Sequence, residues 1–245
     1  MGVRLQAVTT GIALVPILVG CCAMPHPLPV AGGSGKVLTL EGDFTGFDRL
    51  DVSHAFRVEV RQGDGYHVTV RIDDSLEEHL LLDRQGDTLR IGLEPGHTYN
   101  LGAATLGATV QMPELAGLEL SGASRATLQG FQSTRPLYVH VSGASQLRGE
   151  IEAGAGQFKA SGTSQIRLVG SGRDVAIDAS GASQLDLSHF EVDDAEIEAS
   201  GASTVSIRAG GRLDARASGA SRVRYRGEPS IGRIHTSGAS SVDRG

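Results

Sequence analysis

Residues Ser180–Ser203 read SGASQLDLSHFEVDDAEIEASGAS, in which two copies of the tetrapeptide Ser-Gly-Ala-Ser enclose an alternating segment. The whole chain contains six copies of this tetrapeptide and one variant, Ser-Gly-Thr-Ser, at Ser161. Successive copies begin 21, 19, 19, 20, 18 and 19 residues apart, a period typical of repeat architectures. The seven copies begin at Ser121, Ser142, Ser161, Ser180, Ser200, Ser218 and Ser237.

Polar and apolar residues alternate between the tetrapeptides, so that Leu185 and Leu187, or Ile197 and Ala199, point to one side of a strand. A strand rises about 3.3 Å per residue, so one repeat travels roughly 60 Å and closes into a small loop with two or three flat sides. Such a loop is unstable alone, whereas stacked loops share hydrogen bonds and a core. We therefore predict an all-β fold, a single-domain parallel β-solenoid (β-helix) with coils of about 19 residues, over residues 37–245.

The tetrapeptides suit the corners of these coils. Glycine adopts the positive φ of a sharp turn, and serine hydroxyls bond to turn backbone. A nucleophilic serine needs an activating base, and no His or Lys recurs with the seven copies, so a structural role is favoured over catalysis. The predicted corner ladder consists of Ser121, Gly122, Ser142, Gly143, Ser161, Gly162, Ser180, Gly181, Ser200, Gly201, Ser218, Gly219, Ser237 and Gly238.

The first 36 residues predict export and anchoring. Residues 1–20 read as a signal peptide, because Arg4 precedes an apolar run that is too short to span a bilayer. The run Leu18-Val-Gly-Cys21 resembles the bacterial lipobox, which implies cleavage before Cys21 and lipidation of that residue. Residues 21–36 are the lipidated cysteine and a flexible Pro- and Gly-rich tether. We expect an exported lipoprotein of the cell envelope, at the outer membrane, on either its periplasmic or its surface side.

Composition narrows the classes of function. The net charge is -6 and no Lys or Arg run is present, which disfavours nucleic acid as a partner. Only 4% of the residues are aromatic and none is Trp, so we expect a core of Val, Ile, Leu and Ala. Because Cys21 and Cys22 are the two cysteines, no disulfide is expected within the solenoid.

No pattern in the sequence predicts a metal or a cofactor. The eight histidines show neither His-x-His nor His-Glu-x-x-His spacing and are interpreted as surface residues. The adjacent carboxylates Asp73-Asp74, Glu77-Glu78 and Asp193-Asp194 point to opposite sides of a strand, so we interpret them as solvated charge and not as calcium ligands. The histidines are His26, His54, His67, His79, His97, His140, His189 and His235.

The chain resembles a known bacterial family. The resemblance rests on Phe44–Ser53 (FTGFDRLDVS), Phe56–Gly63 (FRVEVRQG), Gly86–Ile91 (GDTLRI) and Val110–Ser124 (VQMPELAGLELSGAS), followed by the glycine-serine repeats. These segments are similar to the putative auto-transporter adhesin head domain, or head GIN domain, and the similarity spans residues 44–240. It implies a β-solenoid, secretion and an adhesion-type role. Because no aromatic-rich translocator segment follows the repeats, we expect the lipid anchor to retain the protein.

Two functions remain open. We predict a non-catalytic binding or adhesion-type module, displayed on its lipid anchor at the membrane, with an envelope protein or a polysaccharide as partner. The alternative is a polysaccharide-active lyase or hydrolase on a β-helix scaffold, with Asp174, Asp178 and Asp186 as candidate carboxylates. Few residues follow the last repeat, so the C-terminal coil is expected to be open to a partner or to self-association.

Overall fold

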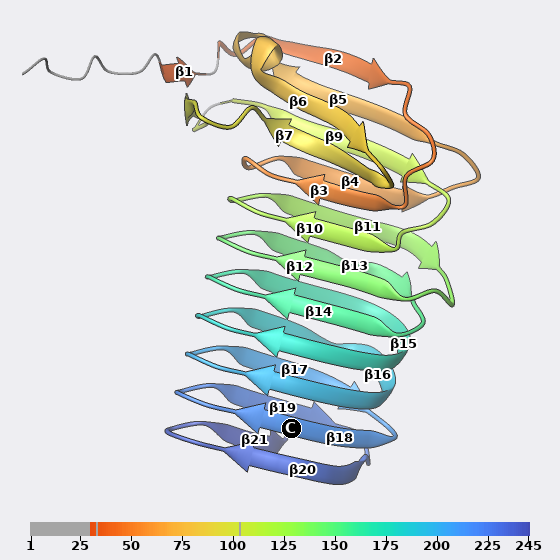
Figure 1. Ribbon diagram of the computed structural model, residues 1–245, viewed down its shortest axis with the longest axis vertical. Helices are drawn as coiled ribbons and strands as arrows, with labels where there is room; N and C mark the ends of the chain where they lie inside the picture. Colours follow the sequence, from red (N-terminus) through yellow and green to blue (C-terminus); the bar gives the residue numbers. More distant parts are fainter. Residues whose placement is uncertain (1–29, 33, 103) are drawn as a thin grey trace, which may run out of the picture.

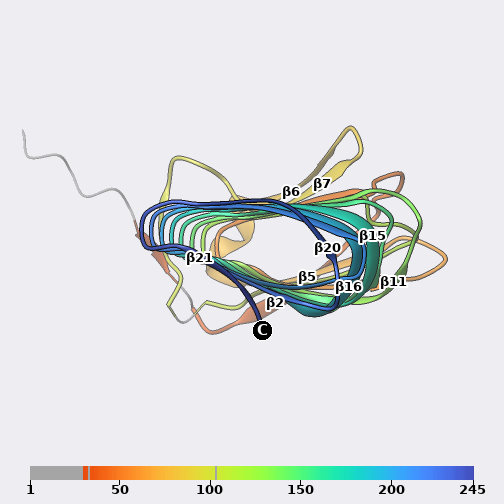
Figure 2. The same ribbon diagram turned by 90° about the horizontal axis from the view of Figure 1, so that it is seen from below.

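The strands are stacked as coils along one long axis (Figure 1). The computed structural model describes residues 30–32, 34–102 and 104–245. About six turns are present, with a spacing of about 20 residues. Viewed along the axis, the coils superpose as flattened loops with two long sides (Figure 2). The structure therefore confirms the predicted all-β solenoid and its repeat.

One long side of the coils, called the first sheet, contains the strands that lead into the corners. Its order from the N-terminal end of the stack is β6 (Leu80–Gln85), β7 (Thr88–Leu93), β3 (Arg49–Val52), β10 (Gly117–Leu120), β12 (Leu137–Val141), β14 (Gly156–Ala160), the later parts of β15 (Gln165–Ala179) and β16 (Gln184–Ala199), β18 (Arg212–Ala217) and β20 (Ser230–Thr236).

The other long side, called the second sheet, contains the strands that follow the corners. Its order is β2 (Val37–Gly42), β5 (His67–Asp73), β9 (Leu106–Met112), β4 (Arg57–Gln62), β11 (Arg125–Gln132), β13 (Gln146–Glu152), the earlier parts of β15 and β16, β17 (Thr204–Ala209), β19 (Arg222–Arg226) and β21 (Ser241–Arg244).

Each regular coil runs along the first sheet, turns at a corner and returns along the second sheet. Leu118 thus pairs with Val139 in the first sheet, and Ala126 pairs with Leu147 in the second. In β15 and β16 the backbone curves from the second sheet into the first within one strand, so these two strands serve both sheets. Apart from bulges in four of the pairings, the register repeats from coil to coil, which keeps equivalent side chains in rows about 4.8 Å apart.

The N-terminal end of the stack departs from the parallel pattern. β2 pairs antiparallel with β5, β5 with β9, and β6 with β7. The 3-10 helix η1 (Asp74–His79), which the sequence analysis did not predict, connects β5 to β6 and buries Leu76. β1 (Val30–Gly32) pairs in parallel with β8 (Thr98–Asn100), so part of the predicted flexible tether runs beside the solenoid.

Strand alternation fills the interior with apolar side chains. Leu185, Leu187 and Ile197 of β16, for example, are completely buried. The prediction of a core without aromatic residues was wrong, because five of the six phenylalanines are buried inside it. Phe158 and Phe190 meet edge to face, with ring centroids 5.9 Å apart. A low aromatic content does not determine where the few aromatic residues lie. Burial of a large aromatic ring is strongly favourable, because it removes a large apolar area from water.

Candidate functional site

The predicted corners form one column along the stack, visible as nested turns in Figure 2. Their glycines have φ angles between 69° and 74°. The N–H of Ala182 donates to the carbonyl of Gly162 at 2.8 Å, and that of Ala202 donates to the carbonyl of Gly181 at 2.7 Å. A Cβ on Gly181 would lie 2.7 Å from the Gly162 carbonyl oxygen. Backbone therefore packs directly on backbone, and both the φ and the space require glycine.

The last serine of each corner points into the core, which the sequence analysis did not predict. Ser164 Oγ donates to the Val141 carbonyl at 3.0 Å, and Ser221 Oγ donates to the Ala199 carbonyl at 3.1 Å. The same hydrogen bond, to the residue that precedes the previous corner, recurs at Ser183, Ser203 and Ser240. These hydroxyls bond to main-chain carbonyls inside the column, which is a structural role.

An eighth corner, Ser53-His54-Ala55-Phe56, lies at the N-terminal side of the column. Val52 pairs with Leu120, so this segment stacks directly against the Ser121 corner. His54 and Ala55 have φ angles of 58° and 63° without being glycine. Phe56 fills the inner position that serine occupies elsewhere. This corner was not predicted from the sequence, because the only residues that it shares with the motif are a serine and an alanine.

The outer side of the second sheet carries arginines that no carboxylate neutralises. Among the described residues, eight arginines have no carboxylate oxygen within 4.0 Å, and seven of these project from the second sheet and are exposed. The eighth, Arg84, donates to the Gly86 carbonyl. We call the other seven the arginine face; they are Arg57, Arg71, Arg125, Arg148, Arg222, Arg224 and Arg226.

The arginine face combines cations with uncharged hydrogen-bonding groups. Arg57 and Arg125 are direct neighbours in register, and three arginines alternate along Arg222–Arg226. Between these two groups runs a continuous row of amide and hydroxyl side chains, namely Gln146, Gln165, Gln184 and Thr204. A shallow depression beside this row is lined by the polar residues Gln184, Thr204 and Ser206 and by Arg224 and Arg226. The carboxylate of Asp186 and the apolar residues Leu185 and Ile207 also line it.

The outer side of the first sheet is different, because its arginines other than Arg84 are in ion pairs. Arg212 bonds to Asp214 at 2.6 Å, and Arg216 bonds to Glu198 at 2.9 Å. The Arg212 guanidinium and the N–H of Arg233 hold the pKa of Asp214 well below its usual range. Charge on this sheet is therefore largely neutralised by neighbouring side chains.

The three carboxylates considered for an enzyme do not converge. Asp174 and Asp178 belong to the part of β15 in the first sheet, whereas Asp186 projects from the second sheet. Burial raises the pKa of Asp186, but hydrogen bonds from Ser188 and the ion pair with Arg167 outweigh it and lower the pKa overall. An ionised carboxylate on the opposite side of the coil cannot act with the other two on one substrate bond.

The carboxylate pair Asp73-Asp74 joins the tether to the solenoid. Asp73 is buried and accepts hydrogen bonds from the N–H groups of Ser34, at 2.8 Å, and Gly35, at 3.0 Å. These bonds, led by that from Ser34, lower the pKa of Asp73 well below its usual range. Asp74 forms an ion pair with Lys36 at 3.6 Å. The pair holds residues 34–36 against the N-terminal end of the stack.

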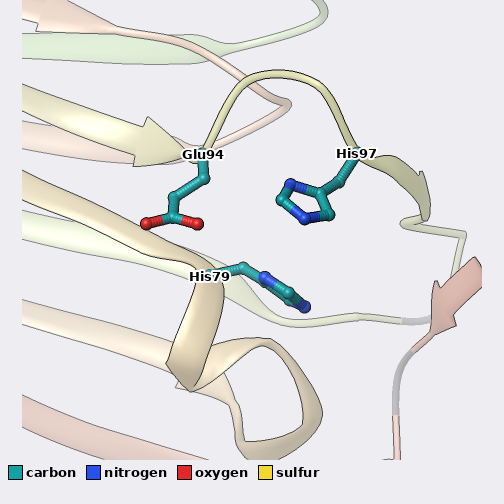
Figure 3. Close-up of side chains that lie close together, drawn as sticks. All are labelled: His79, Glu94 and His97. Atoms are coloured by element: carbon teal, nitrogen blue, oxygen red, sulfur yellow. The ribbon is translucent and has the colours of Figure 1, made fainter. Parts of the chain in front are cut away.

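Two of the histidines predicted as surface residues, His79 and His97, lie close together, and His54 lies near the same tyrosine, Tyr99. His79 and His97 have ring centroids 4.8 Å apart, and the ring of Tyr99 lies 5.6 Å from His79 and 6.1 Å from His54. Glu94 completes the cluster (Figure 3). No sequence spacing indicates it, because the chain returns to this place only after the β6–β7 hairpin.

The predicted signal peptide, Cys21 and His26 lie outside the described residues. Within residues 30–32, 34–102 and 104–245, no helix has the length and apolar composition needed to cross a membrane. At the C-terminal end, β20 and β21 each pair with a strand of the preceding coil, and Ile231 and Ile234 are 51% and 40% exposed.

Comparison with known protein families shows which family the chain belongs to. The family described as "Putative auto-transporter adhesin, head GIN domain" matches residues 46–229, which include the eighth corner and most of both sheets. The chain belongs to this family. The resemblance inferred from the sequence is thereby confirmed. No curated protein matches the chain.

Solved structures share the head GIN domain architecture at low sequence identity. A putative adhesin from Bacteroides fragilis is 16% identical, with a TM-score of 0.80 over 87% of this chain and 99% of that chain. A putative lipid binding protein from Parabacteroides distasonis is 18% identical, with a TM-score of 0.69 over 87% and 98%. A putative adhesin from Parabacteroides merdae is 16% identical, with a TM-score of 0.65 over 87% and 98%. At this identity the likeness concerns the fold.

Proposed function

We propose that the chain is a non-catalytic binding module of the bacterial cell envelope, held by a lipid on Cys21, and that its arginine face binds an acidic polysaccharide. One observation carries this proposal: of the eight exposed arginines that lack a carboxylate partner among the described residues, seven project from one sheet. In a chain with a net charge of -6, cations left unpaired on one face are suited to an anionic ligand.

The chemistry of the face suits a polymer better than a small molecule. Guanidinium groups bind carboxylate, phosphate or sulfate in a bidentate manner. Alternate residues of a strand lie about 7 Å apart, so Arg222, Arg224 and Arg226 offer three evenly spaced sites to repeated anionic groups. The row that contains Gln165 and Gln184 adds amide groups for sugar hydroxyls.

The family and the position of the tether support the same proposal. The family is described as an adhesin head, and two of the related structures are described as adhesins. Residues 34–36 are attached to the N-terminal end of the stack, so the coils extend from the end at which the anchor segment enters. A lipid at Cys21 would leave the arginine face free along the whole stack.

Polymer binding by the full chain with Cys21→Ser, which removes the proposed lipidation site, tests the proposed face. We expect it to bind polygalacturonate, to bind neutral dextran at least tenfold more weakly, and to lose affinity steeply as salt rises. The triple variant Arg222→Glu, Arg224→Glu and Arg226→Glu should bind polygalacturonate at least tenfold more weakly.

The matched control changes the same charge on the first sheet, by Arg49→Glu, Lys159→Glu and Arg233→Glu. Equal weakening by both triple variants would show that net charge alone is responsible and would overturn the assignment to the arginine face. Release of new reducing ends or unsaturated sugars from the polymer would support the enzyme alternative instead.

Cell fractionation tests the anchor separately. The native chain should remain with the membrane fraction, and Cys21→Ser should move to the soluble fraction, whereas Cys22→Ser should remain membrane-bound. Membrane retention of Cys21→Ser from which residues 1–20 have been removed would contradict lipid anchoring at this residue without affecting the test of polymer binding.

A further inference from the structure

Two imidazoles and a carboxylate meet at the N-terminal end of the stack. His79 is the last residue of η1, Glu94 follows β7, and His97 lies in the loop that leads to β8. One ligand atom from each of the three residues lies within 4.8 Å of the other two. Their side chains point toward a common space, as Figure 3 shows.

Local structure holds the three ligands in place. The N–H of Glu94 donates to the His79 carbonyl at 2.9 Å, which fixes the end of η1 against the start of the loop. Gly96, with a φ of 88°, turns the loop back, and the Tyr99 hydroxyl donates to the Glu94 carbonyl at 2.8 Å. Two hydrogen bonds to the main chain of Glu94, one at its N–H and one at its carbonyl, thus hold the start of the loop in place.

The composition and exposure of the cluster suit a transition metal. Two imidazole nitrogens with one carboxylate oxygen form a ligand set that Zn²⁺ accepts readily, whereas Ca²⁺ and Mg²⁺ prefer oxygen alone. The His79 side chain is 20% exposed, and Glu94 and His97 are exposed, so an ion and a water ligand can reach the site. The ligand atoms of a tetrahedral zinc site are about 3.3 Å apart, which small side-chain rotations would achieve here.

We propose that His79, Glu94 and His97 bind one Zn²⁺ ion, or a similar borderline divalent metal, with water in the fourth position. The ion would connect η1, the end of β7 and the segment before β8. β8 pairs with β1, so the ion would fasten the part of the solenoid to which the anchor segment is attached. None of the three ligands belongs to the arginine face, and neither proposal depends on the other.

Zinc titration of an untagged full chain tests the site. The parent carries Cys21→Ser and Cys22→Ser, because free thiolates would bind zinc themselves. Calorimetry should give one Zn²⁺ per chain, with no comparable binding of Ca²⁺, and zinc should raise the thermal midpoint. His79→Ala and His97→Ala should each weaken zinc binding at least tenfold, and Glu94→Gln should weaken it to a smaller extent.

The controls His67→Ala and His235→Ala each remove an exposed imidazole from elsewhere in the stack. They should bind zinc as the parent does. Thermal midpoints in the presence of a chelator establish that each variant is folded. Equal zinc affinity in the parent and in both His79→Ala and His97→Ala would overturn the proposal, as would zinc binding that the two control variants reduce to the same extent.

Discussion

The hydroxyl of Ser164 donates a hydrogen bond to the carbonyl of Val141, 3.0 Å away and one coil earlier in the stack. The equivalent serine of the preceding corner, Ser145, is also buried, but its hydroxyl has no hydrogen-bond partner within the described chain. The carbonyl of Leu120, which would be its acceptor, receives hydrogen bonds from the N–H and the hydroxyl of Ser142 instead. Two serines at one position of the motif therefore have different energetic roles.

Removing the hydroxyl should destabilise the fold at Ser164 but not at Ser145. Ser164→Ala loses an internal hydrogen bond and should lower the free energy of unfolding by about 1 kcal/mol. Ser145→Ala removes a buried hydroxyl that has no partner and should be neutral or stabilising by up to about 1 kcal/mol. Urea unfolding of both variants measures the difference, and equal destabilisation would contradict the assigned role of the inner serine.

Substitutions of two glycines should distinguish the stability cost of backbone strain from the cost of steric clash in the corner column. Gly181 and Gly46 have φ angles of 71° and 72°, but a Cβ would lie 2.7 Å from a backbone oxygen at Gly181 and meets nothing within 4 Å at Gly46. We expect Gly46→Ala to cost about 1 kcal/mol from strain alone, and Gly181→Ala to cost roughly 3 kcal/mol or more. Thermal unfolding of both variants is the measurement. Similar costs would mean that the corners do not pack backbone on backbone.

The carboxylate of Asp73 should make the tether attachment sensitive to acid. Its folded-state pKa lies below the ordinary value of 3.8, chiefly because the N–H of Ser34 donates to it. This stabilisation is complete at neutral pH and is lost as the pH falls below about 4, through the depressed pKa. Asp73→Asn should therefore lower the thermal midpoint at pH 7, and its difference from the native chain should shrink at lower pH. Asp64→Asn, which removes an exposed carboxylate from the β4–β5 turn, is the matched control variant.

The edge formed by β20 and β21 should favour pairing with a second copy of the chain. Within the described residues these strands have hydrogen-bonded neighbours on one side, and Ile231 and Ile234 are exposed beside them. A free strand edge pairs readily with an identical edge. Sedimentation of Cys21→Ser should show concentration-dependent dimers that Ile234→Lys reduces. Val169→Lys, at a 47% exposed position away from this edge, should leave them unchanged, and a monomer at every concentration would contradict the expectation.

The sequence was sufficient to predict the regular part of the solenoid, because one motif sets both the period and the corner chemistry. The glycine of Ser180–Ser183 indicates a positive φ, and alternation in Gln184–Ser188 indicates a strand with one buried side. The corner at His54 was missed because positive φ is held there by the surrounding coil and not by a glycine. The antiparallel strands and η1 at the N-terminal end carry no repeat from which they could be predicted.

Features that depend on three-dimensional stacking were also missed. Arg125 and Arg57 are 68 residues apart in sequence yet neighbours in the second sheet, so no run of basic residues reveals the arginine face. His79 and His97 meet because a β-hairpin brings the chain back to the end of η1. Motifs such as His-x-His detect metal ligands that lie on one helix or strand. They do not detect ligands that are distant in sequence and that the fold brings together.

The corner column has a further consequence for how the number of coils can change during evolution. The carbonyl of each corner glycine accepts a hydrogen bond from the alanine or threonine N–H of the next corner. Every coil therefore provides the same hydrogen-bonding edge for the coil that follows it. Gain or loss of a complete unit would alter the reach of the molecule by about 4.8 Å while leaving the rows of both faces in line. The length of the solenoid can therefore vary without a change in the kinds of side chain that its two outer faces present.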